Sequence, residues 1–241
     1  MKRFYRDVSI VEEKGRYAVA LDGRPLKTQG GGLQQVPTRR LAELLASEWA
    51  AQGETLDPKS FVARDMADYA IDNVSSERES VVAQLLSYAE TDTLCYRADP
   101  EDALFTRQQA EWEPILTRFE TRQGIAFVRV SGIVHRAQPP ETLSTLARNL
   151  ERFDPFALAA LQTLASLAAS LSIALEAAEP DADAAALWDA SCLEERWQTE
   201  LWGEDAEAAD RADRRRAEFL AAHRFLLAAL PCAAETTRPR L

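Results

Sequence analysis

The residue types most able to do chemistry lie together in the stretch SYAETDTLCYR, residues 87–97. Asp92 could serve as a general acid or base, and Cys95 could serve as a nucleophile. Arg97 lies close enough in sequence to lower the pKa of the Cys95 thiol. The stretch is therefore either an active site or a structural motif that contains reactive residue types.

The local spacing favours a structural role for the cysteine. If the chain is extended here, Thr93, Cys95 and Arg97 share one side, while Leu94 and Tyr96 share the other side and face inward. A cysteine nucleophile needs a base and a lowered pKa, and the spacing does not supply the base. We therefore interpret Cys95 as a small residue without a catalytic role.

Other signatures of catalysis and of metal or phosphate binding are missing from the sequence. His135 and His223 have no second His or Cys at ligand spacing, and there is no HExxH, CxxC or GxSxG motif. The GGG at 30–32 lacks the following Lys-Ser or Lys-Thr of a phosphate-binding loop, so we expect a plain loop. The sequence predicts no metal, no cofactor and no catalytic residue.

The charge of the chain excludes some partners. With 28 basic and 39 acidic residues the formal net charge is -11, which argues against a nucleic-acid partner. The three cysteines Cys95, Cys192 and Cys232 are far apart and odd in number, which fits a reducing compartment better than a disulfide framework.

The most unusual stretch is acidic. Residues 176–210 hold twelve acids and one base. One interpretation is a solvated helix face with i,i+4 pairs such as Glu207 with Arg211. The other is an acidic docking surface beside Trp197 and Trp202, since aromatic residues ringed by charge are typical of interface anchors. The sequence leaves both interpretations open.

The pattern of elements predicts an α+β protein. Residues 3–36 alternate as short strands around the hairpin dipeptide DG and should form a small antiparallel sheet. From Thr38 onward the apolar period becomes helical. We expect a β-rich N-terminal domain at residues 1–58 and a larger, mainly helical domain at residues 59–241.

Three details of the helical part are predicted. A long helix contains Pro114, so we expect a kink or break near Trp112. Residues 181–203 read as one helix that stops at Gly203, and residues 204–230 read as the last long helix.

The segment 156–175 carries no charge over 20 residues, which is the length of a membrane span. Its leucines recur at three- and four-residue steps and it contains several Ser, Thr and Gln residues, so we expect one buried helix that begins after the N-cap Asp154. The N-terminus has neither a signal peptide nor a transit peptide pattern. We expect no stable membrane insertion, and a cytoplasmic location if the chain is bacterial.

Several motifs in fixed order give the chain a family resemblance. They are RFYRDVSI, GRYAVALDGRPLKT, LASEWAAQ, AIDNV, YAETDTLCYR, LFTRQQAEWEPIL, GI followed by QP, FALAAL and ERWQTELWGEDAEA. In this order the chain resembles the assembly chaperones of the ATP synthase F(1) sector that act on the α subunit. The resemblance extends from Arg3 to about Leu230, and the hairpin LDGRPLKT, TDTLCYR and the Trp-Gly pair are its most specific parts.

The resemblance implies a binding protein without turnover. Such a protein binds newly made α subunit before it joins the β subunit, prevents its aggregation, needs no cofactor, and is expected to be monomeric when free. Eukaryotic relatives are expected in the mitochondrial matrix. The alternative reading is a nucleotide hydrolase or another small-molecule enzyme.

The resemblance also assigns roles to residues. Acids after the C-terminal Trp-Gly pair are implied to act in client binding, and with the neighbouring aromatic and acidic positions the candidates are Trp197, Trp202, Glu204, Asp205, Glu207 and Asp210. Trp49 is expected to pack in a core. Asp92 is expected to cap a helix end, and Arg97 to form an ion pair.

Overall fold

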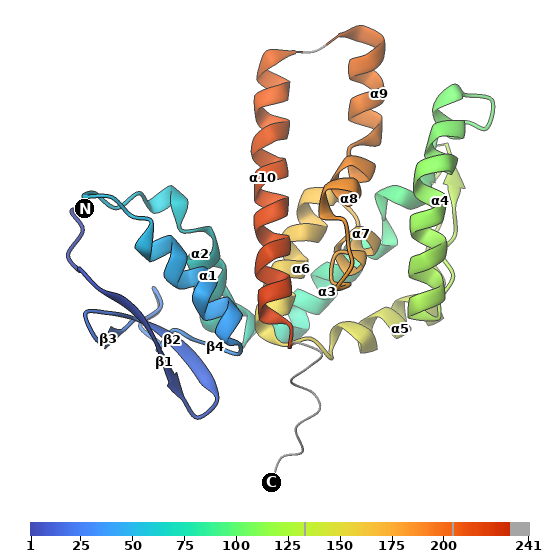
Figure 1. Cartoon of the computed structure of the whole chain (residues 1–241). Helices are drawn as coiled ribbons and strands as arrows, with labels where there is room; N and C mark the ends of the chain where they lie inside the picture. Colours follow the sequence, from blue (N-terminus) through green and yellow to red (C-terminus); the bar gives the residue numbers. More distant parts are fainter. Residues whose placement is uncertain (133, 204, 232–241) are drawn as a thin grey trace. The chain divides into compact units, whose positions relative to one another are not determined.

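The structure is a computed structural model, and it describes residues 1–132, 134–203 and 205–231 (Figure 1). The strands are β1 (Val8–Glu13), β2 (Arg16–Leu21), β3 (Arg24–Pro25), β4 (Gln35–Val36), β5 (Tyr96–Arg97) and β6 (Val130–Ser131). The α-helices are α1 (Arg39–Ala50), α2 (Val62–Tyr69), α3 (Arg78–Glu90), α4 (Ala103–Gln123), α5 (Pro140–Leu150), α6 (Pro155–Ala168), α7 (Leu171–Glu176), α8 (Ala184–Ser191), α9 (Leu193–Trp202) and α10 (Ala206–Ala229). A small antiparallel sheet and a larger helical part confirm the predicted α+β class.

Contacts within the chain divide it into two compact units. The first holds residues 1–78, 154–160 and the segment from Arg224 onward, and the second holds residues 79–153 and 161–223. The boundary that the sequence suggests after residue 58 falls inside the first unit, where α1 and α2 contact each other.

The first unit is built on the sheet of β1 to β4. β1 and β2 pair in antiparallel register from Val8 opposite Leu21 to Glu13 opposite Arg16. The predicted DG hairpin is confirmed, because Asp22 and Gly23 both have positive φ, which matches the twist of a two-residue turn. The sequence did not predict β4, which pairs with β2 at only two positions.

The GGG stretch is a loop between β3 and β4, held by an acid from another element. Asp72 lies in the π-helical turn Ala70–Val74, where it accepts a hydrogen bond from the Gly30 N–H at 2.8 Å and another from the Thr28 hydroxyl at 2.7 Å. A Cβ on Gly30 would lie 2.8 Å from the Asp72 Cγ. Gly30 is therefore needed because the carboxylate approaches the backbone so closely.

Helix α1 begins as the sequence predicts. The Thr38 side chain caps it by accepting from the Leu41 N–H at 3.1 Å. Near its end the Trp49 ring is buried against Tyr5 and Phe61, and the Tyr5 hydroxyl donates to the Trp49 carbonyl at 2.6 Å. This aromatic cluster joins the first residues of the chain to α1.

The expected single helix over 156–175 is wrong, because two helices, α6 and α7, are present. Ala169 has a positive φ of 48°, and Ser170 caps α7 by accepting from the Ile173 N–H at 3.1 Å. A polar centre at Asp92 holds this break, as described below. None of the helices within the described residues is both long enough and apolar enough to span a bilayer.

Of the kink or break expected near Trp112, the break is wrong, because α4 runs as one helix through Pro114. Trp112 is buried and its ring N–H donates to the Ala190 carbonyl at 2.7 Å, which fixes this part of the helix. Pro114 removes one backbone donor, but Pro114 and Ala110 are both exposed, so water can reach the freed carbonyl.

Candidate functional site

The candidate site lies on α8, α9 and α10 in the second unit. The expected single helix over 181–203 is wrong, since Cys192 has φ -96° and ψ 15° and separates α8 from α9. The predicted stop at Gly203 is confirmed: its φ is 90°, and its N–H donates to the Thr199 carbonyl at 2.9 Å. Asp205 then precedes α10 and accepts from the Glu207 N–H at 3.1 Å.

We call residues 193–218, which comprise α9 and the first half of α10, the arm. Ion pairs fix its α9 side to α4: Arg196 contacts Glu111 at 2.7 Å, and Glu200 contacts Arg107 at 2.5 Å. The pKa of the Glu200 carboxyl lies below its usual value because the Arg107 guanidinium donates to it. The α9 side of the arm is therefore held at several points along its length.

A second set of contacts closes the base of the arm between its two helices. The Trp188 and Phe219 rings lie 5.4 Å apart, and the Arg215 guanidinium lies over the Trp188 ring. Arg215 also pairs with Glu195 at 3.2 Å and donates to the Leu167 carbonyl at 2.9 Å. These contacts position α9 and α10 beside each other.

Beyond this base the arm buries very little of itself. Among the described residues from Ala206 to Glu218 none is buried, and in α9 only Leu193 is. At the end of α9 two large apolar side chains face water: Leu201 is 56% exposed and Trp202 is 77% exposed. Large apolar side chains that a fold leaves exposed together are typical of interaction sites.

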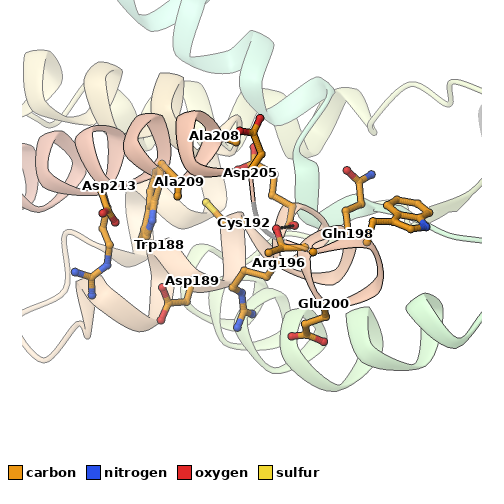
Figure 2. A pocket seen from close by; sticks show the side chains of 16 residues that line it. Trp188, Asp189, Cys192, Arg196, Gln198, Glu200, Asp205, Ala208, Ala209 and Asp213 are labelled. Carbon is orange, nitrogen blue, oxygen red and sulfur yellow. Dashed lines mark hydrogen bonds between the residues drawn. The ribbon is translucent and has the colours of Figure 1, made fainter.

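A groove of about 670 Å³ lies between the two helices of the arm (Figure 2). The α10 residues that line it are Ala208, Ala209, Ala212, Asp213 and Arg216. The other side is lined by residues of α8, α9 and their junctions, which are Trp188, Asp189, Cys192, Glu195, Arg196, Gln198, Thr199, Glu200, Trp202 and Gly203. The α10 residues lie three and four positions apart, so α10 presents one face to the groove.

The structure shows which acids of the 176–210 segment are already engaged. Arginines from elsewhere in the chain pair with several of them: Arg118 and Arg122 with Glu176, Arg107 with Glu200, Arg215 with Glu195 and Arg211 with Glu207. Glu179 also pairs with Arg122. The other six described acids of the segment have no ion pair with any described residue: Asp181, Asp183, Asp189, Glu194, Asp205 and Asp210. Ion pairs thus offset part of the negative charge that a residue count suggests.

The predicted binding residues lie at different places in the arm. Trp202 and Asp205 line the groove near its open end, and Glu207 and Asp210 are exposed on α10 outside its lining. Trp197 is half-buried with the Arg107 guanidinium 5.6 Å from its ring, so it faces α4. Glu204 lies outside the described residues.

Sequence reasoning missed the alanines of the groove. Ala208, Ala209 and Ala212 form its α10 wall, and their one- and four-residue spacing was the available signal. Alanine is only weakly apolar, so it does not mark a clear apolar stripe in a charged helix. The sequence therefore suggested only a solvated helix face here. The space between the helices exists because these side chains are small.

Asp92 is fully buried and lies at the break between α6 and α7. Its carboxylate accepts from the Leu94 N–H at 3.1 Å, from the Ser170 hydroxyl at 2.8 Å and from the Ser172 N–H at 2.8 Å. Burial raises the pKa of Asp92, although these donors favour the ionised form. The bond from Leu94 caps the turn at Thr93–Cys95, as the expected capping role implies, and the bonds from Ser170 and Ser172 join two segments that are distant in sequence.

The expected alternation of residues 93–97 is wrong, because Thr93–Cys95 form a 3-10 turn. Leu94 and Cys95 are consequently both buried. Burial raises the pKa of the Cys95 thiol well above its usual value, which keeps it protonated and a poor nucleophile.

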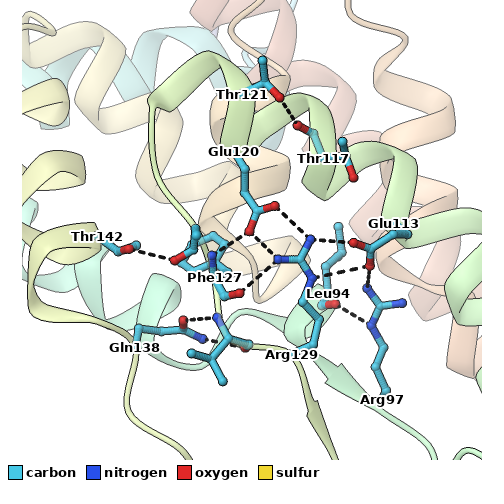
Figure 3. A network of polar contacts seen from close by, with 12 residues as sticks. Leu94, Arg97, Glu113, Thr117, Glu120, Thr121, Phe127, Arg129, Gln138 and Thr142 are labelled. Atoms are coloured by element: carbon cyan, nitrogen blue, oxygen red, sulfur yellow. Dashed lines mark hydrogen bonds and ion pairs between the residues drawn. The ribbon is translucent and has the colours of Figure 1, made fainter.

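Arg97 belongs to a network of charged side chains against α4 (Figure 3). It donates to Glu113 at 3.1 Å, and Glu113 in turn accepts from Arg129 at 2.7 Å. Arg129 also contacts Glu120. The network fastens the short parallel pair β5–β6 to α4.

No group of three or more His, Cys, Asp or Glu side chains within the described ranges is placed to hold a metal ion. Burial also raises the pKa of Cys192, which lines the groove. A raised pKa keeps the Cys192 thiol protonated and makes it a poor nucleophile.

Comparison with known proteins gives consistent relatives. The model of the ATP12 chaperone protein family matches residues 2–120. A curated relative, the mitochondrial protein atp12 of Schizosaccharomyces pombe, is 28% identical over 233 residues, which cover 88% of this chain and 78% of that protein.

Solved structures extend the similarity to nearly the whole chain. Atp12 from Paracoccus denitrificans is 34% identical with a TM-score of 0.90, over 95% of this chain and 98% of that one. The Atu1473 protein of Agrobacterium tumefaciens is 37% identical with a TM-score of 0.89, over 95% of this chain and 86% of that one. The similarity therefore includes the helical part that carries the arm.

Proposed function

The chain belongs to the ATP12 chaperone family, and from this premise we propose that the client of this F(1) ATP synthase assembly chaperone is the unassembled α subunit. The exposed end of the arm is the observation that supports a particular binding surface. There Leu201 and Trp202 project beside the groove and beside the acid Asp205. An aromatic anchor with a polar rim is the composition of a protein-binding surface.

The physical task explains this composition. A subunit of an obligate complex exposes, before assembly, apolar surface that the complex later buries. A chaperone must cover part of that surface and then leave, so its contact should be small and moderately strong. Two large exposed apolar side chains with a few carboxylates suit such a contact better than an extended apolar face would.

We infer a stoichiometric binder without turnover, acting in the cytoplasm if the chain is bacterial. Apolar contact gives the affinity, and the acids near the arm favour encounter with basic client surface. Trp202, Asp205, Glu207 and Asp210 are the residues we propose to contact the client. Glu204 joins them on its sequence position alone.

Co-expression tests the proposal. The chain is expressed with tagged α subunit, or with tagged β subunit as the comparator, in cells lacking their own member of this family. We expect the chain to co-elute with α subunit and not with β subunit in size-exclusion chromatography. Recovery of no α subunit, or equal recovery of both subunits, would overturn the assignment of the client.

A phosphate-release assay separates this function from that of a nucleotide hydrolase. Purified chain is incubated with ATP and Mg²⁺, and inorganic phosphate is measured with malachite green. We expect no phosphate above the buffer control. Release that scales with protein and that one substitution abolishes would favour the enzyme.

A further inference from the structure

The arm leaves an open groove that is lined by α8 and α9 on one side and by α10 on the other (Figure 2). We propose that this groove receives a single amphipathic helix of the client, with its apolar stripe inward and Lys or Arg on its flank. The inference rests on the proposed function, since it names how the same partner is held.

The dimensions of the groove fit a helix. Its α10 wall runs from Ala208 to Arg216, which at 1.5 Å per residue is about 12 Å, or about two helical turns. A helix with its side chains is about 10 Å across, so one turn occupies roughly 400 Å³. The groove of about 670 Å³ can therefore take the inward face of a helix of about two turns.

The side chains of the wall favour close helix packing. Ala208, Ala209 and Ala212 form a low ridge, and the distance between packed helices depends on the side chains at the contact. Trp188 lies at the closed base and Trp202 at the open end. Large apolar side chains of an incoming helix would fill the space between these two rings, as in other helix-in-groove complexes.

The charges around the groove favour an occupant helix that carries Lys or Arg on its flank. Glu195 is neutralised by Arg215, Arg196 by Glu111 and Glu200 by Arg107. Of the remaining lining residues, Asp189, Asp205 and Asp213 are acids without an ion pair to a described residue, and Arg216 is the one such base. The uncompensated charge of the described lining is thus negative, which suits Lys or Arg on the occupant.

Filling the groove tests the inference without touching the exposed end of the arm. Ala209→Trp places an indole on the α10 wall, whereas Ala217→Trp makes the same change on an exposed position of α10 that does not line the groove. We expect Ala209→Trp to lower capture of α subunit at least tenfold and Ala217→Trp to leave it unchanged. Equal capture by both variants would overturn the groove as the binding site.

Hydrogen exchange is measured on the unmodified protein, so its result does not depend on whether a variant folds. With bound α subunit, we expect slower amide exchange in residues 195–202 and 205–216 than in the free chain. Unchanged exchange there, with α subunit bound, would place the contact elsewhere and overturn the inference while the proposed client stands. If no α subunit is captured at all, the result contradicts the proposed client itself.

A synthetic peptide tests the helix and its charge without the α subunit. The probe is an 18-residue Leu/Lys amphipathic helix, and its control carries Glu in place of Lys. We expect the Lys peptide to shift Trp202 emission to shorter wavelength, an effect lost in Trp202→Phe and in Ala209→Trp, and the Glu peptide to bind at least tenfold more weakly. Equal binding of the two peptides, or a concentration-dependent dimer of the free chain that Ala209→Trp dissociates, would contradict the proposed occupant.

Discussion

The Ser170 hydroxyl donates a hydrogen bond of 2.8 Å to the carboxylate of Asp92, across 78 positions of the chain. The same carboxylate accepts from the backbone N–H groups of Leu94 and Ser172. This centre joins the 3-10 turn after α3 to the start of α7, at the place where α6 stops. The stretch that contains the most reactive residue types is therefore a structural joint.

Asp92→Ala should destabilise the protein strongly. The change leaves buried donors without an acceptor, and each such group costs about 1–3 kcal/mol, so we expect a loss of about 3 kcal/mol in the free energy of unfolding. Urea denaturation followed by circular dichroism measures it. Asp99→Ala is the control, because Asp99 is exposed and should cost less than about 0.5 kcal/mol. Equal losses for the two variants would refute the structural role.

Gly30→Ala should destabilise the first unit because the added Cβ would meet the Asp72 carboxylate at 2.8 Å. Asp72 must then move and lose its hydrogen bonds to Gly30 and Thr28, so we expect a loss of about 1–2 kcal/mol. Gly53→Ala is the matched control, since no atom lies within 4 Å of its Cβ position. Thermal melts of the two variants compare them, and a Gly30→Ala protein as stable as Gly53→Ala would be the contrary result.

Much of the fold follows from local signals in the sequence. The DG hairpin, the helix start at Thr38 and the stop or kink at Gly203 each depend on the conformation of a few neighbouring residues, and the structure confirms the hairpin, the start and the stop. The break between α6 and α7 could not be found in this way. Ser170 reads as one polar residue in an apolar helix, and its role as a cap depends on Asp92, which is distant in sequence.

The site shows the same division between local and distant causes. Trp202 comes directly before Gly203, which ends the helix, so an exposed side chain could be expected there. Nothing in the sequence indicated a different environment for Trp197. Its position against α4 depends on Arg107, which is 90 positions earlier. Arginines distant in sequence also neutralise Glu176 and Glu200, so counting acids overstated the negative field.

Trp202→Ala should separate binding from stability. The side chain is 77% exposed, so its removal should change the free energy of unfolding by less than about 0.5 kcal/mol. Loss of an interface anchor should weaken capture of α subunit at least tenfold, which corresponds to about 1.4 kcal/mol. Co-elution with tagged α subunit and a urea midpoint give the two values. An unfolded variant, or one with full capture, would argue against Trp202 as an anchor.

The double variant Glu207→Lys with Asp210→Lys should slow association with the α subunit. Both acids are exposed on α10, so the fold should persist while encounter with basic surface becomes less favourable. Association rates at low and high salt measure the effect, which should shrink as salt rises. Glu12→Lys with Glu13→Lys makes the same charge change on β1, where both acids are also exposed, and should leave the rate unchanged.

Asp22 should have a pKa below the usual value, because the backbone N–H groups of Asp7 and Arg6 donate to its carboxylate. A carboxyl whose pKa is lower in the folded state than in the unfolded state stabilises the fold above the unfolded pKa of about 3.9. That contribution is lost as pH falls through the folded value. Carbon NMR titration, with Asp22→Asn to assign the signal, tests this, and a midpoint at or above 3.9 would contradict it.

The lack of buried side chains between Ala206 and Glu218 has a consequence for how this chain can change over time. Apart from changes at Arg215, which holds α10 to its neighbours, substitutions on that stretch alter folding little as long as the helix itself is kept, so selection on it comes chiefly from whatever it touches. Homologous proteins should therefore diverge there in step with their partners, while the residues around Asp92 stay fixed whichever partner they serve.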